Sequence, residues 1–211
     1  MENIVVGITG ASGIIYAKRL LQELSLSEYS IHVAISDAAA VIARHELEIP
    51  LNGNRQDLMN LLGHVPDNIA YYHHANIGAT IASGQFPVKA MIIVPCSMNT
   101  LCSIAHGISN NLIQRAASVT LKEGRKLVLV PRETPLSSIH LEAMVKLSSA
   151  GACIMPAMPA FYHKPKTLYD LVDFVVARIL DSIPMQHTLV SRWHSEEFTP
   201  DYRQFVTDKK P

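Results

Sequence analysis

The sequence predicts an α/β fold: a doubly wound, mainly parallel sheet with helices on both faces. Three observations support this prediction. Apolar runs alternate with amphipathic stretches along the 211 residues. The apolar runs are short and continuous, which is typical of strands buried on both faces. Each polar cluster of interest follows the end of an apolar run, where ligands bind in folds of this class.

Five strands are predicted, and each is a run of β-branched or other apolar side chains. The last three stop at Pro95, Pro131 and Pro156. Proline cannot donate a hydrogen bond to a neighbouring strand, so it is a natural end. In chain order, the predicted strands are residues 4–8, 31–35, 91–94, 127–130 and 152–155.

Five helices are predicted from apolar residues spaced three or four positions apart. The fourth is followed directly by Gly151, a residue type that is common just after a helix. Residues 50–86 have no regular pattern, and no element is predicted there. In chain order, the predicted helices are residues 14–24, 38–45, 112–123, 137–150 and 167–183.

The composition predicts one domain over residues 1–195, followed by a polar C-terminal tail over residues 196–211. Charged residues make up only 17% of the chain, against a usual share of about 25%. We therefore expect part of the surface to be buried against other copies of the chain. The 18 basic and 18 acidic residues cancel, whereas a nucleic-acid binder normally has a basic excess. No apolar run approaches the roughly 20 residues of a membrane span.

The three cysteines predict a reducing compartment. Cys96, Cys102 and Cys153 are odd in number and have no close spacing, which speaks against a disulfide framework. The chain enters its first strand almost directly after Met1, so no signal peptide is expected. A cytoplasmic protein is the resulting expectation.

A glycine-rich turn over residues 7–13 joins the first strand to the first helix. Glycine lets the backbone approach a ligand, and the N-terminus of the helix offers free N–H groups to an anion. A dinucleotide site would continue with another glycine, where this chain has Tyr16. A dinucleotide-dependent oxidoreductase, with Asp37 on the ribose, is therefore a disfavoured alternative. A tight turn without a ligand also stays open.

Two further polar clusters follow the third and fourth strands. Ser97 and Thr100 could cap the next helix, or they could hold a phosphate or the edge of a ring. Arg132 and Glu133 lie in a loop that two prolines make stiff. The planar guanidinium of arginine suits a phosphate. Glu133 could be a catalytic group or only the partner of Arg132.

A proline-rich segment over residues 156–165 holds Phe161 and Tyr162 in fixed positions, and it could be an oligomer contact. On the helix that follows, Arg178 shares a face with apolar side chains. Such an arginine either extends its charge to solvent or pairs with a buried anion. The histidines have no ligand spacing, so we expect no metal site.

Together these segments resemble the UbiX/Pad family of flavin prenyltransferases over about residues 4–193. The matching blocks occur in the family's order, and in residues 50–86 only Ser83-Gly84 matches. The blocks are residues 7–13, 95–100, 110–117, 120–123, 127–135, 140–142 and 156–165.

The resemblance implies that reduced FMN, as a co-substrate, is joined at N5 and C6 to the dimethylallyl group of dimethylallyl phosphate. It implies a flavodoxin-like or Rossmann-like, doubly wound domain that assembles into a dodecamer with sites between subunits. It also implies a product that passes to a UbiD-type decarboxylase. No metal is implied, and the chain has no Asp-Asp pair to hold one. Protein cations must then stabilise the leaving phosphate. The alternative is an FMN-binding accessory subunit of an aromatic-acid decarboxylase, without transferase activity.

The resemblance also implies roles for single residues. Glu133 is the implied acid/base residue, with Ser12 and Glu46 as further proton-handling candidates, and Trp193 is placed near the flavin ring. The implied contacts to dimethylallyl phosphate are Arg115, Lys122, Arg132, Tyr162 and Arg178. The implied contacts to FMN are Gly10, Ala11, Ser12, Ser36, Ser97, Met98, Asn99, Thr100 and Arg132.

Overall fold

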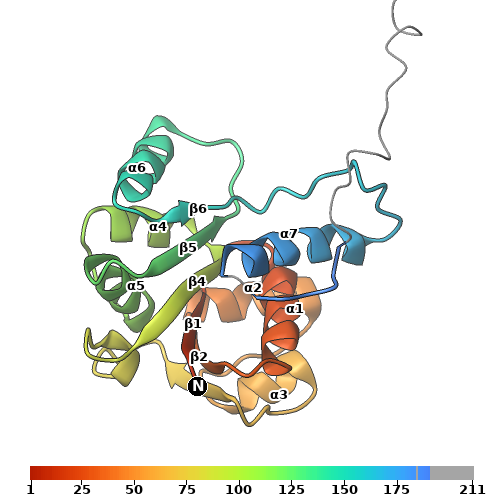
Figure 1. The fold of residues 1–211 in the computed structure, drawn as a ribbon, viewed down its shortest axis with the longest axis horizontal. Coiled ribbons are helices and arrows are strands. Elements are labelled where there is room, and N and C mark those ends of the chain that lie inside the picture. Colours follow the sequence, from red (N-terminus) through yellow and green to blue (C-terminus); the bar gives the residue numbers. More distant parts are fainter. Residues whose placement is uncertain (184, 191–211) are drawn as a thin grey trace, which may run out of the picture.

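Six strands form one sheet in the computed structural model, which describes residues 1–183 and 185–190 (Figure 1). The strands are β1 (Asn3–Ile8), β2 (Ser30–Ile35), β3 (Ile69–His73), β4 (Val88–Cys96), β5 (Lys126–Pro131) and β6 (Cys153–Ile154). Their order is β3-β2-β1-β4-β5-β6, and every neighbouring pair is parallel. Trp193 and the predicted tail over residues 196–211 lie outside the described residues.

The strand order reverses between β1 and β4. From β1 the chain adds β2 and β3 on one side, then crosses back to add β4, β5 and β6 on the other. Without β3, the order of the remaining five strands is the flavodoxin-like one, and with β3 it is the Rossmann order. In both cases the crevice for a ligand lies at the carboxyl ends of β1 and β4.

All five predicted strands are confirmed, and β3 was missed. β3 is an edge strand, and only Ile69 among its residues is fully buried. The rest of its sequence, Ala-Tyr-Tyr-His, lacks the continuous apolar run by which the other strands were predicted. The last strand is also shorter than predicted, because only Cys153 and Ile154 pair with β5.

Helices cover both faces of the sheet, as predicted (Figure 1). One apolar cluster joins the sheet to α1, α2, α3 and α7, and a second joins it to α4, α5 and α6. None of the helices in the described ranges is long and apolar enough to cross a membrane. The helices are α1 (Ile14–Ser25), α2 (Asp37–Leu47), α3 (Gln56–Leu62), α4 (Met98–Ala105), α5 (Leu112–Lys122), α6 (Ser138–Ser149) and α7 (Leu168–Ser182), with a 3₁₀ turn at Thr80–Ala82.

A buried carboxylate organises part of the segment where no element was predicted. Asp57 in α3 is fully buried, and it accepts the N–H groups of Asn52, Gly53 and Asn54. These bonds satisfy the backbone that enters α3 and make up for the charge's lost hydration. The path of the chain into α3 is therefore held by one buried side chain, which a periodic pattern does not reveal.

The buried imidazole of His32 makes the stability of the fold depend on pH. His32 in β2 is 9% exposed, and its ring bonds to the Tyr72 hydroxyl and to Oδ1 of Asn3, both at 3.1 Å. Burial lowers the pKa of His32 below its ordinary value of 6.5. The unfolded chain therefore takes up a proton at a higher pH than the folded chain. The contribution of His32 is complete above pH 6.5 and is lost as the pH falls towards the lower folded pKa.

We expect the free energy of unfolding in urea to fall between about pH 7.5 and about pH 5.5, and His32→Gln to flatten this dependence. His64→Gln is the matched control, because His64 is exposed. An equal pH dependence in the wild type and in His32→Gln would contradict the assignment.

Candidate functional site

A buried threonine brings two of the predicted polar segments together. Thr9 follows β1 and is 2% exposed. Its hydroxyl donates to the carbonyl of Pro95 at 2.8 Å and accepts the N–H of Ser97 at 2.7 Å. The turn after β1 is thereby fastened to the start of α4. Thr9 was not among the predicted site residues, although a threonine directly after a buried strand was a usable signal.

Glycine is needed at two positions of the turn after β1, for different physical reasons. A Cβ on Gly10 would lie 2.3 Å from the Cβ of Ala38, so only glycine lets the turn approach α2. Gly13 has a φ of 108°, a conformation that favours glycine, and it caps α1. The turn is thus packed between two helices at the crevice.

The N-terminus of α1 is not free for a ligand, which corrects the sequence-based expectation. The Glu46 carboxylate, from the last turn of α2, accepts the N–H of Gly13 at 2.9 and 3.0 Å and that of Ile14 at 3.0 Å. The ring of Tyr16 covers the same turn, 2.8 Å from where a Cβ on Gly13 would lie. Burial, and then Glu46, raises the pKa of Tyr16. A dinucleotide would need this helix end for its pyrophosphate, so its occupation by a carboxylate argues against that alternative.

Two other helix N-termini lie at the same edge of the sheet. Ser36 caps α2 by accepting the N–H of Ala39 at 3.2 Å. Ser97 caps α4 by accepting the N–H of Thr100 at 3.3 Å, and its hydroxyl donates to Oγ1 of Thr100 at 3.0 Å. The capping role of Ser97, which the sequence left as one of two possibilities, is therefore confirmed. Anions bind well at such helix ends.

Arg132 connects the turn after β1 to the end of β5. Its Nε lies 3.4 Å from the carbonyl of Ser12. Glu133 accepts the N–H of Thr134 at 3.1 Å. Among the ion pairs of residues 1–183 and 185–190, none joins Glu133 to Arg132. In this structure, Glu133 is therefore not the ion-pair partner of Arg132.

A small cavity of about 180 Å³ lies beside Arg132 and Glu133. It joins the loop after β5 to the proline-rich segment after β6, two segments that the sequence singled out separately. Its walls are mostly apolar, so it suits a small apolar group next to a charged one. The lining residues are Pro131, Arg132, Glu133, Thr134, Leu136, Met144, Pro156, Ala157 and Met158.

Tyr162 and Arg178 lie along one face of α7. The Tyr162 ring packs edge-on against Phe174, with centroids 5.8 Å apart. Phe174 and Arg178 are four residues apart, which places them one turn apart on the same face of the helix. Arg178 is exposed, and Nη1 pairs with Oδ2 of Asp181 at 3.3 Å. Tyr162 thus contacts the face of α7 that also carries Arg178.

Lys122 is not gathered with these residues in one chain. Lys122 ends α5 and pairs with Glu123, beside the backbone of Gly84. β5 begins four residues later, and Arg132 follows its other end. A six-residue strand spans about 20 Å, so Lys122 lies at the opposite edge of the sheet. Arg115 is exposed on the first turns of α5.

The remaining FMN candidates differ in exposure. Ala11 and Met98 are buried, Ser12 is half-buried, and Asn99 is exposed beside them.

Burial raises the pKa of the Cys96 thiol and, less strongly, that of Cys102. A raised pKa favours the protonated thiol, which is the less nucleophilic form. Among the residues that the structure describes, no three His, Cys, Asp or Glu side chains are grouped to hold a metal ion.

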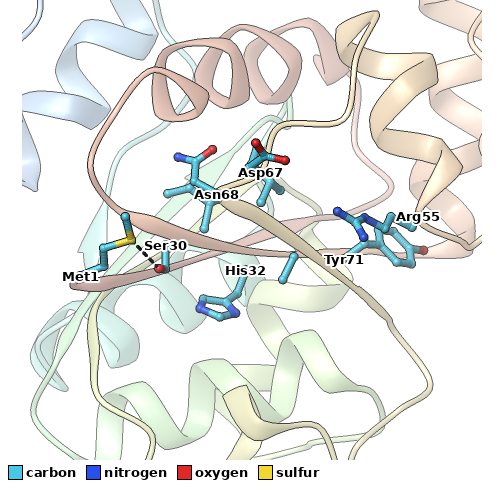
Figure 2. Close-up of a pocket in the computed structure, with 10 residues that line it drawn as sticks. Met1, Ser30, His32, Arg55, Asp67, Asn68 and Tyr71 are labelled. Atoms are coloured by element: carbon cyan, nitrogen blue, oxygen red, sulfur yellow. Dashed lines mark hydrogen bonds between the residues drawn. The ribbon is translucent and has the colours of Figure 1, made fainter.

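A larger cavity lies away from this corner. It measures about 520 Å³ and follows β2 and β3 from their amino ends, past His32, Tyr71 and Arg55 (Figure 2). None of its lining residues is a predicted site residue. The predicted site residues at the carboxyl edge are therefore separate from this cavity.

Comparisons with known proteins show the family of the chain. The model of the Flavoprotein family matches residues 1–180. The chain is 49% identical over 188 residues to "Flavin prenyltransferase UbiX" of Alkalihalophilus pseudofirmus, covering 89% of this chain and 94% of the relative. A crystal structure of AnUbiX (PadA1) in complex with FMN and dimethylallyl pyrophosphate is 37% identical, with a TM-score of 0.82 over 92% of this chain and 97% of the other. A dodecameric FMN-dependent UbiX-like decarboxylase from Escherichia coli O157:H7 is 42% identical, with a TM-score of 0.82 over 91% and 99%.

Proposed function

The chain belongs to the flavoprotein family, as one of its flavin prenyltransferases, and from this premise we propose that FMN and the prenyl donor meet at Arg132. The observation that carries the proposal is the position of this arginine. Its Nε contacts the carbonyl of Ser12 while its side chain lines the small apolar cavity. One cation thus serves both the flavin side and the prenyl side of the site.

The residues at the β1–β4 crevice fit FMN. The close packing of Gly10 on Ala38 leaves the turn after β1 without a side chain at its tightest point. Because Glu46 holds the N-terminus of α1, the FMN phosphate goes to the ends of α2 and α4, where Ser36 and Ser97 lie. When bound, reduced FMN supplies the ring nitrogen N5 and the ring carbon C6 to which the prenyl group is joined.

The prenyl donor is dimethylallyl phosphate in this proposal, with its hydrocarbon part in the cavity of about 180 Å³. That volume is well below the roughly 300–1,000 Å³ of pockets for drug-sized ligands, so it favours a short chain. Arg132, Arg178 and the Tyr162 hydroxyl stabilise the charge that develops on the departing phosphate. Protein cations and hydrogen-bond donors thus stabilise the leaving phosphate, which is the task of Mg²⁺ in prenyl-transferring enzymes with Asp-rich motifs.

Proton transfer is assigned to three groups around this corner. Glu133 lines the cavity and accepts on a carboxylate oxygen the proton that ring closure releases from C6. Glu46 is held in place by the backbone of Gly13 and Ile14, directly after Ser12. In this proposal Ser12 and Glu46 handle a proton on the flavin side of Arg132.

The site of one chain is completed by a neighbouring subunit in this proposal. Lys122 lies at the opposite edge of the sheet, so in this proposal a second copy brings it to the phosphate, while Arg115 contributes from the first turn of α5. The exposed apolar side chains of α6, Ile139, Leu141 and Val145, are consistent with extensive subunit contacts. The assembly is a dodecamer, as in the similar decarboxylase structure. The product passes to a UbiD-type decarboxylase in the cytoplasm, where the three free thiols stay reduced.

The test is an anaerobic incubation of the purified full chain with reduced FMN and dimethylallyl phosphate, followed by mass spectrometry of the released flavin. We expect a gain of one five-carbon prenyl unit. Unmodified FMN, released from protein that demonstrably binds it, would overturn the proposal in favour of the accessory subunit.

A further inference from the structure

The chain folds back along α7 after that helix ends (Figure 1). Met185 donates its N–H to the carbonyl of Leu180 at 3.2 Å. Met185 and Leu189 both pack against the apolar cluster that includes α1 and α7. His187 lies between these two anchors, so the protein backbone places its ring beside the last turn of α7.

Both carboxylate oxygens of Asp181 are used. Oδ2 accepts from Nη1 of Arg178 at 3.3 Å, and Oδ1 accepts from Nε2 of His187 at 3.2 Å. The His187 side chain is only 9% exposed. Its Nδ1 is buried and has no hydrogen-bond partner in the part of the chain that the structure describes. The polar contact of this ring is therefore the one to Asp181, which prevents the carboxylate from turning away from Arg178.

We propose that Asp181 and His187 are positioning residues that orient Arg178 for the phosphate of the prenyl donor. This inference rests on the proposed function, in which Arg178 binds that phosphate. A long arginine side chain loses rotamer freedom when it binds an anion. A fixed carboxylate that already accepts one N–H group restricts the arginine before the anion binds, so less rotamer freedom is lost on binding. The other four N–H groups of the guanidinium stay available for the phosphate.

A simple surface ion pair does not account for this arrangement. Pairs three residues apart on a helix contribute little to stability and need no second donor. Here the second donor is a buried imidazole, carried by a segment that packs on the core. The contact from His187 acts on the orientation of Asp181 and, through it, on Arg178.

The test measures steady-state prenyl transfer with dimethylallyl phosphate. We expect Asp181→Asn to raise KM for dimethylallyl phosphate about fivefold, with little change in kcat, because an oriented ion pair is worth a factor of this size. FMN affinity should not change. His187→Ala should raise KM in the same direction. His187→Gln should restore it, because the glutamine amide can donate from nearly the same place as Nε2.

The double variant Asp181→Asn/His187→Ala should show no larger change than Asp181→Asn alone, since both residues act through one contact. Asp173→Asn is the matched control. Asp173 lies on the same helix and pairs with Arg19 of α1 at 2.6 Å, so its loss weakens the attachment of α7 without touching Arg178.

Arg178→Ala separates this inference from the proposed function. An unchanged KM in Arg178→Ala would overturn the phosphate-binding role of Arg178 itself. A raised KM in Arg178→Ala, with unchanged values in Asp181→Asn and His187→Ala, would overturn only the positioning role. If Asp181→Asn fails to fold, the comparison of His187→Ala with His187→Gln tests the positioning role instead. Equal KM values in these two variants would contradict the inference.

Discussion

Glu133→Gln is expected to lower the rate of prenyl transfer by about 10²- to 10⁴-fold, the usual contribution of a positioned acid or base. Glutamine keeps the size of the side chain and can still accept the N–H of Thr134, but it cannot take up the proton that ring closure releases. Because Glu133 makes no ion pair with Arg132, its loss should leave that cation in place. The measurement is the single-turnover rate of prenylated flavin formation under anaerobic conditions.

FMN binding should stay intact in this variant, as judged from the quenching of flavin fluorescence. Glu28→Gln is the matched control, because Glu28 is exposed in the turn between α1 and β2, at the opposite edge of the sheet. A Glu133→Gln enzyme with a normal rate would show that another group, such as the departing phosphate, accepts the proton.

Gly10→Ala is expected to damage both the fold and the flavin site. The added Cβ would lie 2.3 Å from the Cβ of Ala38 and 3.1 Å from its carbonyl carbon, so the turn after β1 and the start of α2 must move apart. Overpacking of this kind costs about 1–3 kcal/mol. The same movement shifts Ser36, which caps α2, and FMN affinity should fall together with stability.

Urea unfolding and FMN titration measure the two effects of Gly10→Ala. Gly78→Ala is the control, since a Cβ there would meet only Oδ1 of Asn76, at 3.7 Å. Unchanged stability in Gly10→Ala would mean that the turn and α2 are not held as closely as described.

Local patterns predicted much of the fold and most of the candidate site. Buried parallel strands have continuous apolar runs, so five of six strands could be located from the sequence. In such a sheet the polar residues after each strand meet at one edge. For this reason Ser12, Ser97 and Arg132 could be grouped before any coordinates were known.

Contacts between distant residues could not be predicted in this way. Nothing local indicates that Glu46 caps α1 from the end of α2, or that Thr9 fastens the turn after β1 to α4. The periodicity that locates α5 does not show that Lys122 ends at the edge of the sheet opposite to Arg132. The expectation of free N–H groups on α1 was wrong because a side chain more than 30 residues away fills that place.

The sequence by itself determined the class of fold, the edge of the sheet that carries the site, and the resemblance to flavin prenyltransferases. These properties depend on short-range periodicity and on motifs of a few residues. Only the tertiary structure decided that Glu46 occupies the N-terminus of α1, how Asp57 orders the backbone before α3, and that Asp181 contacts both Arg178 and His187. Each of these depends on hydrogen-bond partners that the folded chain brings together, and a carboxylate binds whichever N–H or cation the packing places within about 3 Å of it.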